Sequence, residues 1–526
     1  MGIETRGYNL KELDEHWLVR KALTERFLEA GFEKHDNTQL EMVLKYRENT
    51  NFRKTRQKYL VDFYFFFPAS LKLVEKGYKP RHFYFNLTNH LRLRSPDMLP
   101  SEFLDIDNTD FPIGKLYTLK QQMLQSSEVD QTEDALENFK FAANYLLNYF
   151  KTINIDGCFP IDYCFDEHYD LELELSELLL DAYRTILKRY SDIFANRYPD
   201  FVEKLGYIDE YVSYMFETNW ATFLQNGASE ELKEKVRTII EQEIAYRKIK
   251  NNPVPGEDHK SMQKSFVYRL SLLKKFLQSQ LYLDDKYVKV KNYLVQFIAM
   301  FAAGLAAMVA YSLELFRNQL NPVLGLTPGI LIIISSLIYI LKDRIKDLIK
   351  LIMGKTIVQK YDTARKLMLP SNPRKSFADF HEAVTIVPKP QIDERVLKIR
   401  EFSLSQRLDR TKVEDVIHYS KSMDIDWKRL KQSGPNILHE IKEIFRFNLR
   451  DFLYGLDDPT QNFIAYDISR REPVTLELDK LYHVNVILHI KNTTGIEDDD
   501  AFFRIRLIVD RKGIRGIQNI AVEGVA

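Results

Sequence analysis

The sequence of 526 residues has few cysteines, few glycines and no excess of charge of either sign. Its two cysteines, Cys158 and Cys164, are too far apart for a CxxC redox pair and lack the spacing of a zinc site, so we expect two reduced thiols. Its 19 glycines are about half the usual share of about 7%, which disfavours glycine-rich phosphate-binding folds. Lys+Arg and Asp+Glu both number 75, which argues against a chain that binds nucleic acid over its whole surface.

The remaining composition is that of a folded protein. Hydrophobic residues make up 45% of the chain, which excludes general disorder. At about 100–200 residues per domain, the length predicts three or four structural units. The first 18 residues are polar and charged, so we expect no cleaved signal peptide.

Two charge-free apolar runs, Tyr293–Leu313 and Asn321–Leu341, are the most informative part of the sequence. Each has a helical length of roughly 31 Å at 1.5 Å per residue, which matches the hydrocarbon core of a bilayer. We therefore predict a transmembrane hairpin over 293–341, with spans 293–313 and 321–341 joined by Glu314–Leu320. The alternative is a buried hairpin in the core of a large soluble fold.

The orientation of this hairpin follows from the basic residues beside it, because Lys and Arg concentrate on the cytoplasmic side. Basic residues flank both runs, whereas the connection between them has only Arg317: Lys274, Lys275, Lys286, Lys289 and Lys291 precede the first run, and Lys342, Arg344, Lys346, Lys350, Lys355 and Lys360 follow the second. We predict a multi-pass protein of the bacterial inner membrane with cytoplasmic N- and C-termini.

Small residues in the two runs indicate close helix packing. Ala302, Ala306 and Ala310 are spaced four apart, and Gly325 and Gly329 form a GxxxG step. Such positions let helices approach in lipid, either within the hairpin or between copies of the chain. Neither predicted span has an ionisable residue, which favours an anchor or signalling hairpin over a transporter.

The sequence outside the hairpin predicts an α+β membrane protein. Mixed helical and β-containing cytoplasmic domains are expected on both sides of the hairpin. We divide the chain into a β-containing region (1–110), a helical region (111–256), an amphipathic stem (257–292), the hairpin (293–341), a basic stem helix (342–368), a helical region (369–455) and a β-rich C-terminal region (456–526).

The periodicity of apolar residues places the individual elements. Strands are predicted at Tyr59–Phe67, His82–Arg94, Val474–Leu478, Tyr482–Lys491 and Phe502–Asp510. Helices are predicted at Ala135–Tyr149, Glu172–Tyr190, Phe201–Leu224, Glu230–Ile249, Met262–Leu281, Val413–Tyr419 and Ile437–Tyr454. Because two or three strands make a poor independent sheet, we predict that N- and C-terminal strands join one composite domain. The alternative is two separate β-containing modules.

No motif in the sequence carries recognisable chemistry. The patterns GxxxxGK[ST], GxGxxG, GxSxG and HExxH are absent, and the calcium-like start at Asp105 lacks the later ligands of such a loop. We therefore assign no catalytic, cofactor-binding or metal-binding residue and expect no cofactor.

Several weaker candidates have a simpler interpretation as surface groups. His439 and Glu443 are spaced i, i+4 on the predicted helix, but no third ligand is nearby. His483 and His489 share a strand face about 20 Å apart, too far for one metal. The remaining candidates are the polar cluster Asp379, His381 and Glu382, the acidic run Asp166, Glu167, His168, Asp170, Glu172 and Glu174, and the basic stretch Arg47–Lys58 with Arg53, Lys54, Arg56, Tyr46, Phe52 and Tyr59 interleaved.

Three segments are similar to parts of bacterial membrane proteins with two transmembrane helices and uncharacterised activity. They are Tyr59–Leu71 (YLVDFYFFFPASL), His82–Pro96 (HFYFNLTNHLRLRSP) and Phe502–Ile514 (FFRIRLIVDRKGI). The resemblance covers about a tenth of the chain and implies a membrane location without any functional residue.

Three functions remain from the sequence. The first is a non-enzymatic, membrane-anchored scaffold or sensor, with the lipid bilayer and an unidentified protein as partners and no nucleic acid. The second is an effector whose hairpins oligomerise and disrupt the membrane, because a lone hairpin encloses no pore. The third is an enzyme with an unrecognised acidic or histidine site.

Overall fold

The computed structural model describes most of the chain. The described residues are 14, 31–48, 55–68, 71, 73, 77–95, 98–125, 130–152, 165–225, 229–254, 260–288, 290–324, 327–353, 363–369, 372–387, 391–401, 414–433, 440–493 and 499–522. Cys158, Cys164, Gly325 and His439 lie outside these residues, so the predictions made for them have no structural counterpart here.

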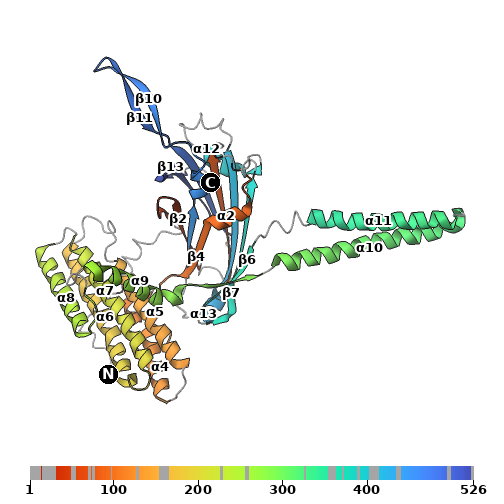
Figure 1. Ribbon diagram of the computed structural model, residues 1–526. Coiled ribbons are helices and arrows are strands. Elements are labelled where there is room, and N and C mark those ends of the chain that lie inside the picture. The colour runs from red at the N-terminus through yellow and green to blue at the C-terminus, as the bar shows by residue number, and fades with distance from the viewer. Residues whose placement is uncertain are drawn as a thin grey trace.

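The described part of the chain forms a mixed α+β structure, with 53% of its residues in helices and 32% in strands. Figure 1 shows a bundle of helices, a β-sheet body beside it and a long helical hairpin that projects away from both. The bundle and the body have separate hydrophobic cores.

The bundle contains the helices expected between residues 135 and 281. Its members are α3 (Pro100–Leu104), α4 (Pro112–Gln125), α5 (Asp130–Thr152), α6 (Phe165–Phe194), α7 (Pro199–Phe223), α8 (Glu230–Ile249) and α9 (Lys260–Gln278), which ends in a 3-10 turn, η2 (Ser279–Leu281). Large aromatic side chains such as Phe139, Tyr183 and Trp220 are fully buried at its centre. The apolar spacing of three to four residues thus places α5 to α9 correctly, because each buries one stripe against its neighbours.

The body consists of two antiparallel sheets. The smaller sheet has the order β1-β2-β9-β4, formed by Gly31–Lys34, Gln39–Arg47, Glu440–Asn448 and Leu87–Leu93. The larger has the order β14-β13-β12-β3-β8-β7-β6-β5. Its strands are Gly513–Ile520, Asp499–Asp510, Tyr482–Asn492, Arg56–Pro68, Glu414–Asp426, Asn372–Val387, Thr363–Leu369 and Asp284–Val288.

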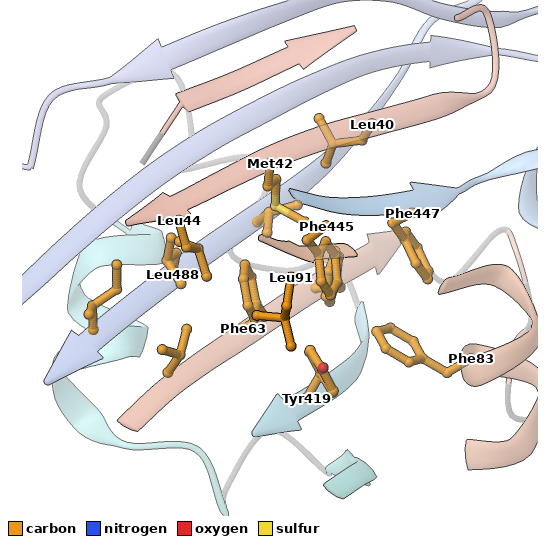
Figure 2. Packing of buried hydrophobic residues seen from close by; sticks show 14 of the residues in the cluster. Leu40, Met42, Leu44, Phe63, Phe83, Leu91, Tyr419, Phe445, Phe447 and Leu488 are labelled. Atoms are coloured by element: carbon orange, nitrogen blue, oxygen red, sulfur yellow. The ribbon is translucent and has the colours of Figure 1, made fainter. Parts of the chain in front are cut away.

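The two sheets pack face to face through aromatic side chains (Figure 2). Alternate residues of β3 point into this core, and Phe63 stacks on Phe445 of β9 with ring centroids 5.0 Å apart. The opposite face of β3 carries Phe66, which packs beneath α12 (Glu394–Glu401). The dense aromatic run at residues 59–67 is therefore explained by a strand that is buried on both faces.

The body is composite, as the sequence analysis predicted. β3, from the N-terminal part, is hydrogen-bonded to β12 on one side and to β8 on the other. In the smaller sheet, β9 lies between β2 and β4. Residues from both sides of the hairpin in sequence therefore build each sheet, which confirms the shared domain.

Three local predictions were wrong. His82–Arg94 is not one strand: α2 (Pro80–Asn86) begins at a proline, which suits the first helical turn, and β4 follows it. The helices expected at Val413–Tyr419 and Ile437–Tyr454 are largely the strands β8 and β9, joined by α13 (Trp427–Ser433), with only the short α14 (Arg450–Leu453) after them. In both strands burial alternates residue by residue, so period two overrides helical spacing.

The hairpin is inserted between two neighbouring strands of the larger sheet. β5 leads into α10 (Val290–Leu324), α11 (Pro328–Met353) returns beside it, and β6 pairs with β5. The connection predicted at Glu314–Leu320 is helical, and the turn lies further along, after Leu324. A second, two-stranded arm, β10 (Thr460–Asp467) with β11 (Glu472–Asp479), projects elsewhere (Figure 1).

Candidate functional site

The helix α10 has the properties of a membrane span over Gln296–Gln319. In the described part of the chain it alone is long and apolar enough to cross a bilayer, by length and composition, and only 17% of its apolar window is buried. In α11 the charge-free stretch Pro328–Leu341 has 14 residues, about 21 Å, against a hydrocarbon core of about 30 Å. The prediction of two spans is therefore not confirmed.

Large apolar side chains are exposed along both helices of the hairpin. On α10 these are Phe297, Met300, Phe301, Leu305, Met308, Tyr311, Leu313, Leu315 and Phe316, and on α11 they are Ile330, Ile332, Ile333, Leu337, Tyr339, Ile340, Leu341, Leu348, Leu351 and Ile352. A contiguous apolar surface of this extent marks a site that binds lipid or another protein.

The two helices meet along the predicted line of alanines. Ala302 and Ala306 are fully buried, Ala310 is half-buried, and α11 is the helix that lies alongside α10 in Figure 1. In contrast, a Cβ built on Gly329 would contact nothing, so Gly329 has no role in close packing within the chain. The alanines are therefore used inside the hairpin.

Sequence reasoning missed a polar contact inside the hairpin. Arg317 of α10 donates a hydrogen bond to the Ser335 hydroxyl of α11, forms an ion pair with Glu314 at 3.4 Å and donates to Asn318 Oδ1 at 2.9 Å. Arg317 and Glu314 seemed to belong to a connection outside the spans. The signal that could have placed them correctly is Pro328, which favours the first turn of a new helix.

A buried arginine lies at the root of the hairpin, where β5 and β6 pair. Arg365 of β6 bonds Asp285 of β5 and Glu382 of β7, each at 2.9 Å, and its guanidinium lies 4.5 Å from the ring centroid of Phe380. The side chain of Arg365 is 8% exposed. The strand that precedes α10 and the strand that follows α11 are thus joined by one cation.

Further polar and charged side chains extend from Glu382 into the core of the body. The Tyr419 hydroxyl donates to Glu382 at 2.5 Å, and Lys421, two residues further along β8, donates to Glu443 of the facing sheet at 2.6 Å. Burial lowers the pKa of Lys421, an effect that the Glu443 carboxylate opposes. These contacts hold the side chains of Glu382 and Glu443 in place, because each carboxylate accepts a hydrogen bond from a donor.

Glu443 is the best example of a candidate that the structure reassigns. It lies on a strand, and Tyr46 and Asn89 donate to its two oxygens at 2.6 Å each, in addition to Lys421. Its partner in the proposed pair, His439, is outside the described residues. Glu443 is therefore a structural carboxylate of the core.

The other histidine and acidic candidates also lie in structural contacts or outside the described side chains. His381 and Glu382 are neighbours on β7 and so face opposite sides of the sheet, and burial lowers the pKa of His381. His489 pairs with Asp500 at 3.2 Å and stacks on Phe502, whereas His483 lies towards the other end of the same strand. In the acidic run, Asp170 pairs with Lys235 at 2.9 Å, Tyr149 donates to Glu172, and the side chains of Asp166, Glu167 and His168 are not described.

The basic stretch Arg47–Lys58 is not an open anion patch in its described part. Arg47 pairs with Glu440 at 2.5 Å, and Arg56 pairs with Asp424 and Asp379 at 2.8 and 3.0 Å. The interleaved Tyr46 and Tyr59 are buried. Phe52, Arg53 and Lys54 lie outside the described residues. No group of three potential metal ligands occurs among the residues the structure describes.

The bundle has an ionic cluster of its own. Arg184 of α6 donates to both oxygens of Glu243 on α8, at 2.6 and 2.8 Å, and to Asp209 of α7 at 3.0 Å. Ser213 also donates to Glu243. The cluster ties three helices together.

The comparisons with family models, with curated proteins and with solved structures returned no match.

Proposed function

We propose that this chain is a non-enzymatic scaffold or sensor anchored in the inner membrane of a bacterium by the hairpin α10–α11. The observation that carries the proposal is the row of exposed apolar side chains on a hairpin that leaves the body (Figure 1). In water these side chains contribute no burial free energy, whereas lipid that covers them contributes about 25 cal/mol per Å² of apolar surface removed from water.

The root of the hairpin supports a location of both flanking parts on one side of the membrane. β5 and β6 are hydrogen-bonded neighbours, with Tyr287 opposite Arg365. The chain therefore enters and leaves the lipid at one point, and the bundle and body lie together on the cytoplasmic side that the basic residues indicate.

Two complete crossings are the form that the sequence suggested, but the charges of α11 favour a shallower anchor. The stretch free of charge is about 10 Å shorter than the hydrocarbon core. Lys342 and the charges after it would each cost about 3 kcal/mol near the centre of a bilayer. We therefore propose an anchoring hairpin in which α10 supplies the apolar window Gln296–Gln319 and α11 does not cross the whole bilayer.

A sensing role has its support at the hairpin root. Arg365 links β5, β6 and β7, and the contacts that follow reach Glu443 in the facing sheet. A change in the position of the hairpin in lipid would therefore alter the packing of the two sheets.

The oligomerising effector is the second candidate, and the alanine line bears on it. Ala302 and Ala306 are already buried within one hairpin and cannot join copies, whereas Gly304 and Gly329 remain open. Release of a dye trapped in vesicles, accompanied by large oligomers, would favour the effector over the scaffold.

A deletion tests the anchor directly. Replacing residues 290–353 by a short Gly-Ser linker joins β5 to β6 and should move the protein from the membrane fraction to the soluble fraction. The matched control removes the other projecting arm, residues 460–479, whose Phe463, Ile464 and Tyr466 are also exposed. If the hairpin deletion remains in carbonate-washed membranes, or if the arm deletion leaves them, the proposal is wrong.

A further inference from the structure

The projecting arm β10–β11 leaves one edge of β10 free. In the described part of the chain the two strands form a sheet of their own, and β11 is the one strand that is hydrogen-bonded to β10. A two-stranded hairpin alone is marginally stable at best in water. We infer that β10 pairs antiparallel with β10 of a second copy of this chain, so that two arms form one four-stranded sheet.

The hydrogen bonds of the arm indicate which backbone groups of β10 are free. The Lys480 amide donates to the carbonyl oxygen of Pro459, and the strand register puts these two residues opposite each other. They are thus a hydrogen-bonded pair, and such pairs alternate with pairs whose N–H and C=O groups point away from the neighbouring strand. The residues of β10 that direct these groups to the outer edge are therefore Thr460, Asn462, Ile464 and Tyr466.

The two edges of the arm differ in their protection against pairing. On β11, Pro473 lies opposite Tyr466 and so occupies an outward position, and three of the eight residues of this strand are acidic. Proline and charge on an edge strand oppose pairing with another chain. β10 has neither proline nor charge from Thr460 to Tyr466, and Ile464 in its middle is 72% exposed. The edge of β10 is therefore the one that fits a second strand.

A two-fold axis at Ile464 gives compatible neighbours along the whole strand. Ile464 then lies opposite Ile464 of the second copy. The large Phe463 lies opposite the small Ala465 of the second copy, and Gln461 lies opposite its Asp467. Side chains directly opposite each other across two strands interact, and no like charges meet in this register.

The charges at the two ends of the arm are complementary in the same register. Arg470 and Arg471 are at the tip, and Asp458 is at the base. Because the pairing is antiparallel, the tip of each arm reaches the base of the other. The side chains of Arg470 and Asp458 are 69% and 84% exposed, and the ion pairs that they form within one chain, with Asp467 at 3.8 Å and Arg511 at 3.1 Å, are weak surface pairs. Complementary charges at both ends favour this direction of pairing.

Lipid is the other cover that an apolar arm could take, and two features disfavour it. Residues 460–479 contain four acids and two arginines, whereas an anionic membrane surface attracts basic segments. The arm also leaves the body in a different direction from the hairpin α10–α11 (Figure 1), so a bilayer that takes the hairpin does not take the arm.

The mass of the full-length protein in mild detergent, measured by sedimentation, tests the inference. The unaltered protein should have twice the mass of one chain, and deletion of residues 460–479 should halve it. Asn462→Pro removes an outward N–H group from the edge of β10 and should also halve the mass. The matched control is Glu477→Pro, directly opposite Asn462 on β11, which changes the other edge and should remain a dimer.

Single cysteines test the register in a Cys158→Ser, Cys164→Ser background. Ile464→Cys would lie opposite its own copy with the two Cα atoms about 5.5 Å apart, which is within the range of a disulfide. Oxidation should link two chains about tenfold faster through Ile464→Cys than through Thr475→Cys, because pairing raises the local concentration of the first thiol alone. Thr475 is directly opposite Ile464 on β11 and serves as the control.

Three results would overturn the inference. They are an unaltered protein with the mass of one chain, a dimer that survives Asn462→Pro or the arm deletion, and equal cross-linking through both cysteines. A disulfide from Ile464→Cys to a different protein would likewise replace the second copy by another partner. Each of these results leaves the membrane anchor intact, because the hairpin deletion tests the anchor separately.

Discussion

The Nζ of Lys421 and the Oε2 of Glu443 lie 2.6 Å apart between the two sheets, and their side chains are 1% and 0% exposed. One residue comes from β8 of the larger sheet and the other from β9 of the smaller, so the ion pair joins the layers. Phe63 and Phe445 flank the ammonium group, with ring centroids 5.1 and 5.4 Å from Nζ. The surrounding core is apolar, which makes each charge dependent on the other.

The first prediction concerns this pair. Glu443→Gln should destabilise the body by about 3–5 kcal/mol, because it leaves the Lys421 ammonium buried without a counter-charge. The double variant Glu443→Gln, Lys421→Met removes both charges but keeps an amide oxygen as an acceptor for Tyr46 or Asn89, and it should cost much less. Urea unfolding of the three proteins measures the difference. Equal losses for the single and double variants would show that the charges are not coupled.

The second prediction concerns pH and the bundle. Burial opposes the charged form of Glu243, but hydrogen bonds from Arg184 and Ser213 outweigh it and hold the pKa of Glu243 below its usual value of 4.5. A depressed carboxyl pKa contributes stability that is present above pH 4.5 and is lost as the pH falls through the folded-state pKa. Thermal melting followed by circular dichroism should therefore show a bundle that weakens below pH 4.5.

Two substitutions test the origin of that acid sensitivity. Glu243→Gln should lower stability at pH 7 by about 3 kcal/mol, since Arg184 loses its bidentate partner, and should flatten the acid dependence. Glu241→Gln, at an exposed position of the same helix, should change neither. An acid dependence that survives Glu243→Gln unchanged would assign it to other carboxyls.

The sequence was most informative where burial covers one stripe or both faces of an element. The bundle helices and β3 were predicted correctly because their apolar patterns follow from such burial. Patterns failed where a short segment fits two periods. The apolar residues of Glu440–Asn448 fit a helical spacing as well as they fit a strand. Only the position of this segment between β2 and β4 makes it a strand.

The hairpin shows a second limit of sequence reasoning. The charges of Glu314 and Arg317 indicated a connection between two helices. Both residues are nevertheless part of α10, and Arg317 donates a hydrogen bond to Ser335 of α11. The buried ion pair could not be predicted from the sequence either. Lys421 and Glu443 are not typical core residues, and their pairing depends on the contact between the two sheets.

The third prediction concerns a backbone position that requires glycine. Gly513 has a φ of +145°, and a Cβ there would lie 2.3 Å from the carbonyl oxygen of Asn37. Gly513→Ala should therefore destabilise the body by about 1–3 kcal/mol. Gly516→Ala, whose Cβ would meet only Ile508 Cδ1 at 3.8 Å, serves as the control and should change stability by less than about 0.5 kcal/mol. Similar losses in both variants would contradict the conformational argument.

The fourth prediction concerns the composite body. A fragment of residues 1–281 contains the whole bundle but lacks β8 and β12, the two neighbours of β3. It should keep its helical circular dichroism signal and be cleaved by protease within β2 and β3, because isolated strands are unstable in water. A fragment that resists protease over residues 39–68 would show that the N-terminal strands fold alone.

The last prediction concerns the depth of the hairpin. The charge-free stretch Pro328–Leu341 of α11 measures about 21 Å, whereas the hydrocarbon core measures about 30 Å. The turn should therefore stay within the bilayer. In the proposed anchor the bundle should lie on the same side as the body, since β5 and β6 are paired, and the basic residues beside the hairpin predict that this side is cytoplasmic.

Single cysteines read out this arrangement in a Cys158→Ser, Cys164→Ser background. A membrane-impermeant thiol reagent should label Lys250→Cys, at the exposed C-terminal end of α8, only in inside-out vesicles. It should label Thr327→Cys, at the start of α11, in neither inside-out vesicles nor intact cells, and both sites should react once detergent dissolves the membrane. Labelling of Thr327→Cys on intact cells would establish two complete crossings, because the turn would then reach the outer surface. Labelling of both sites in inside-out vesicles alone would place the hairpin outside the lipid on the cytoplasmic side.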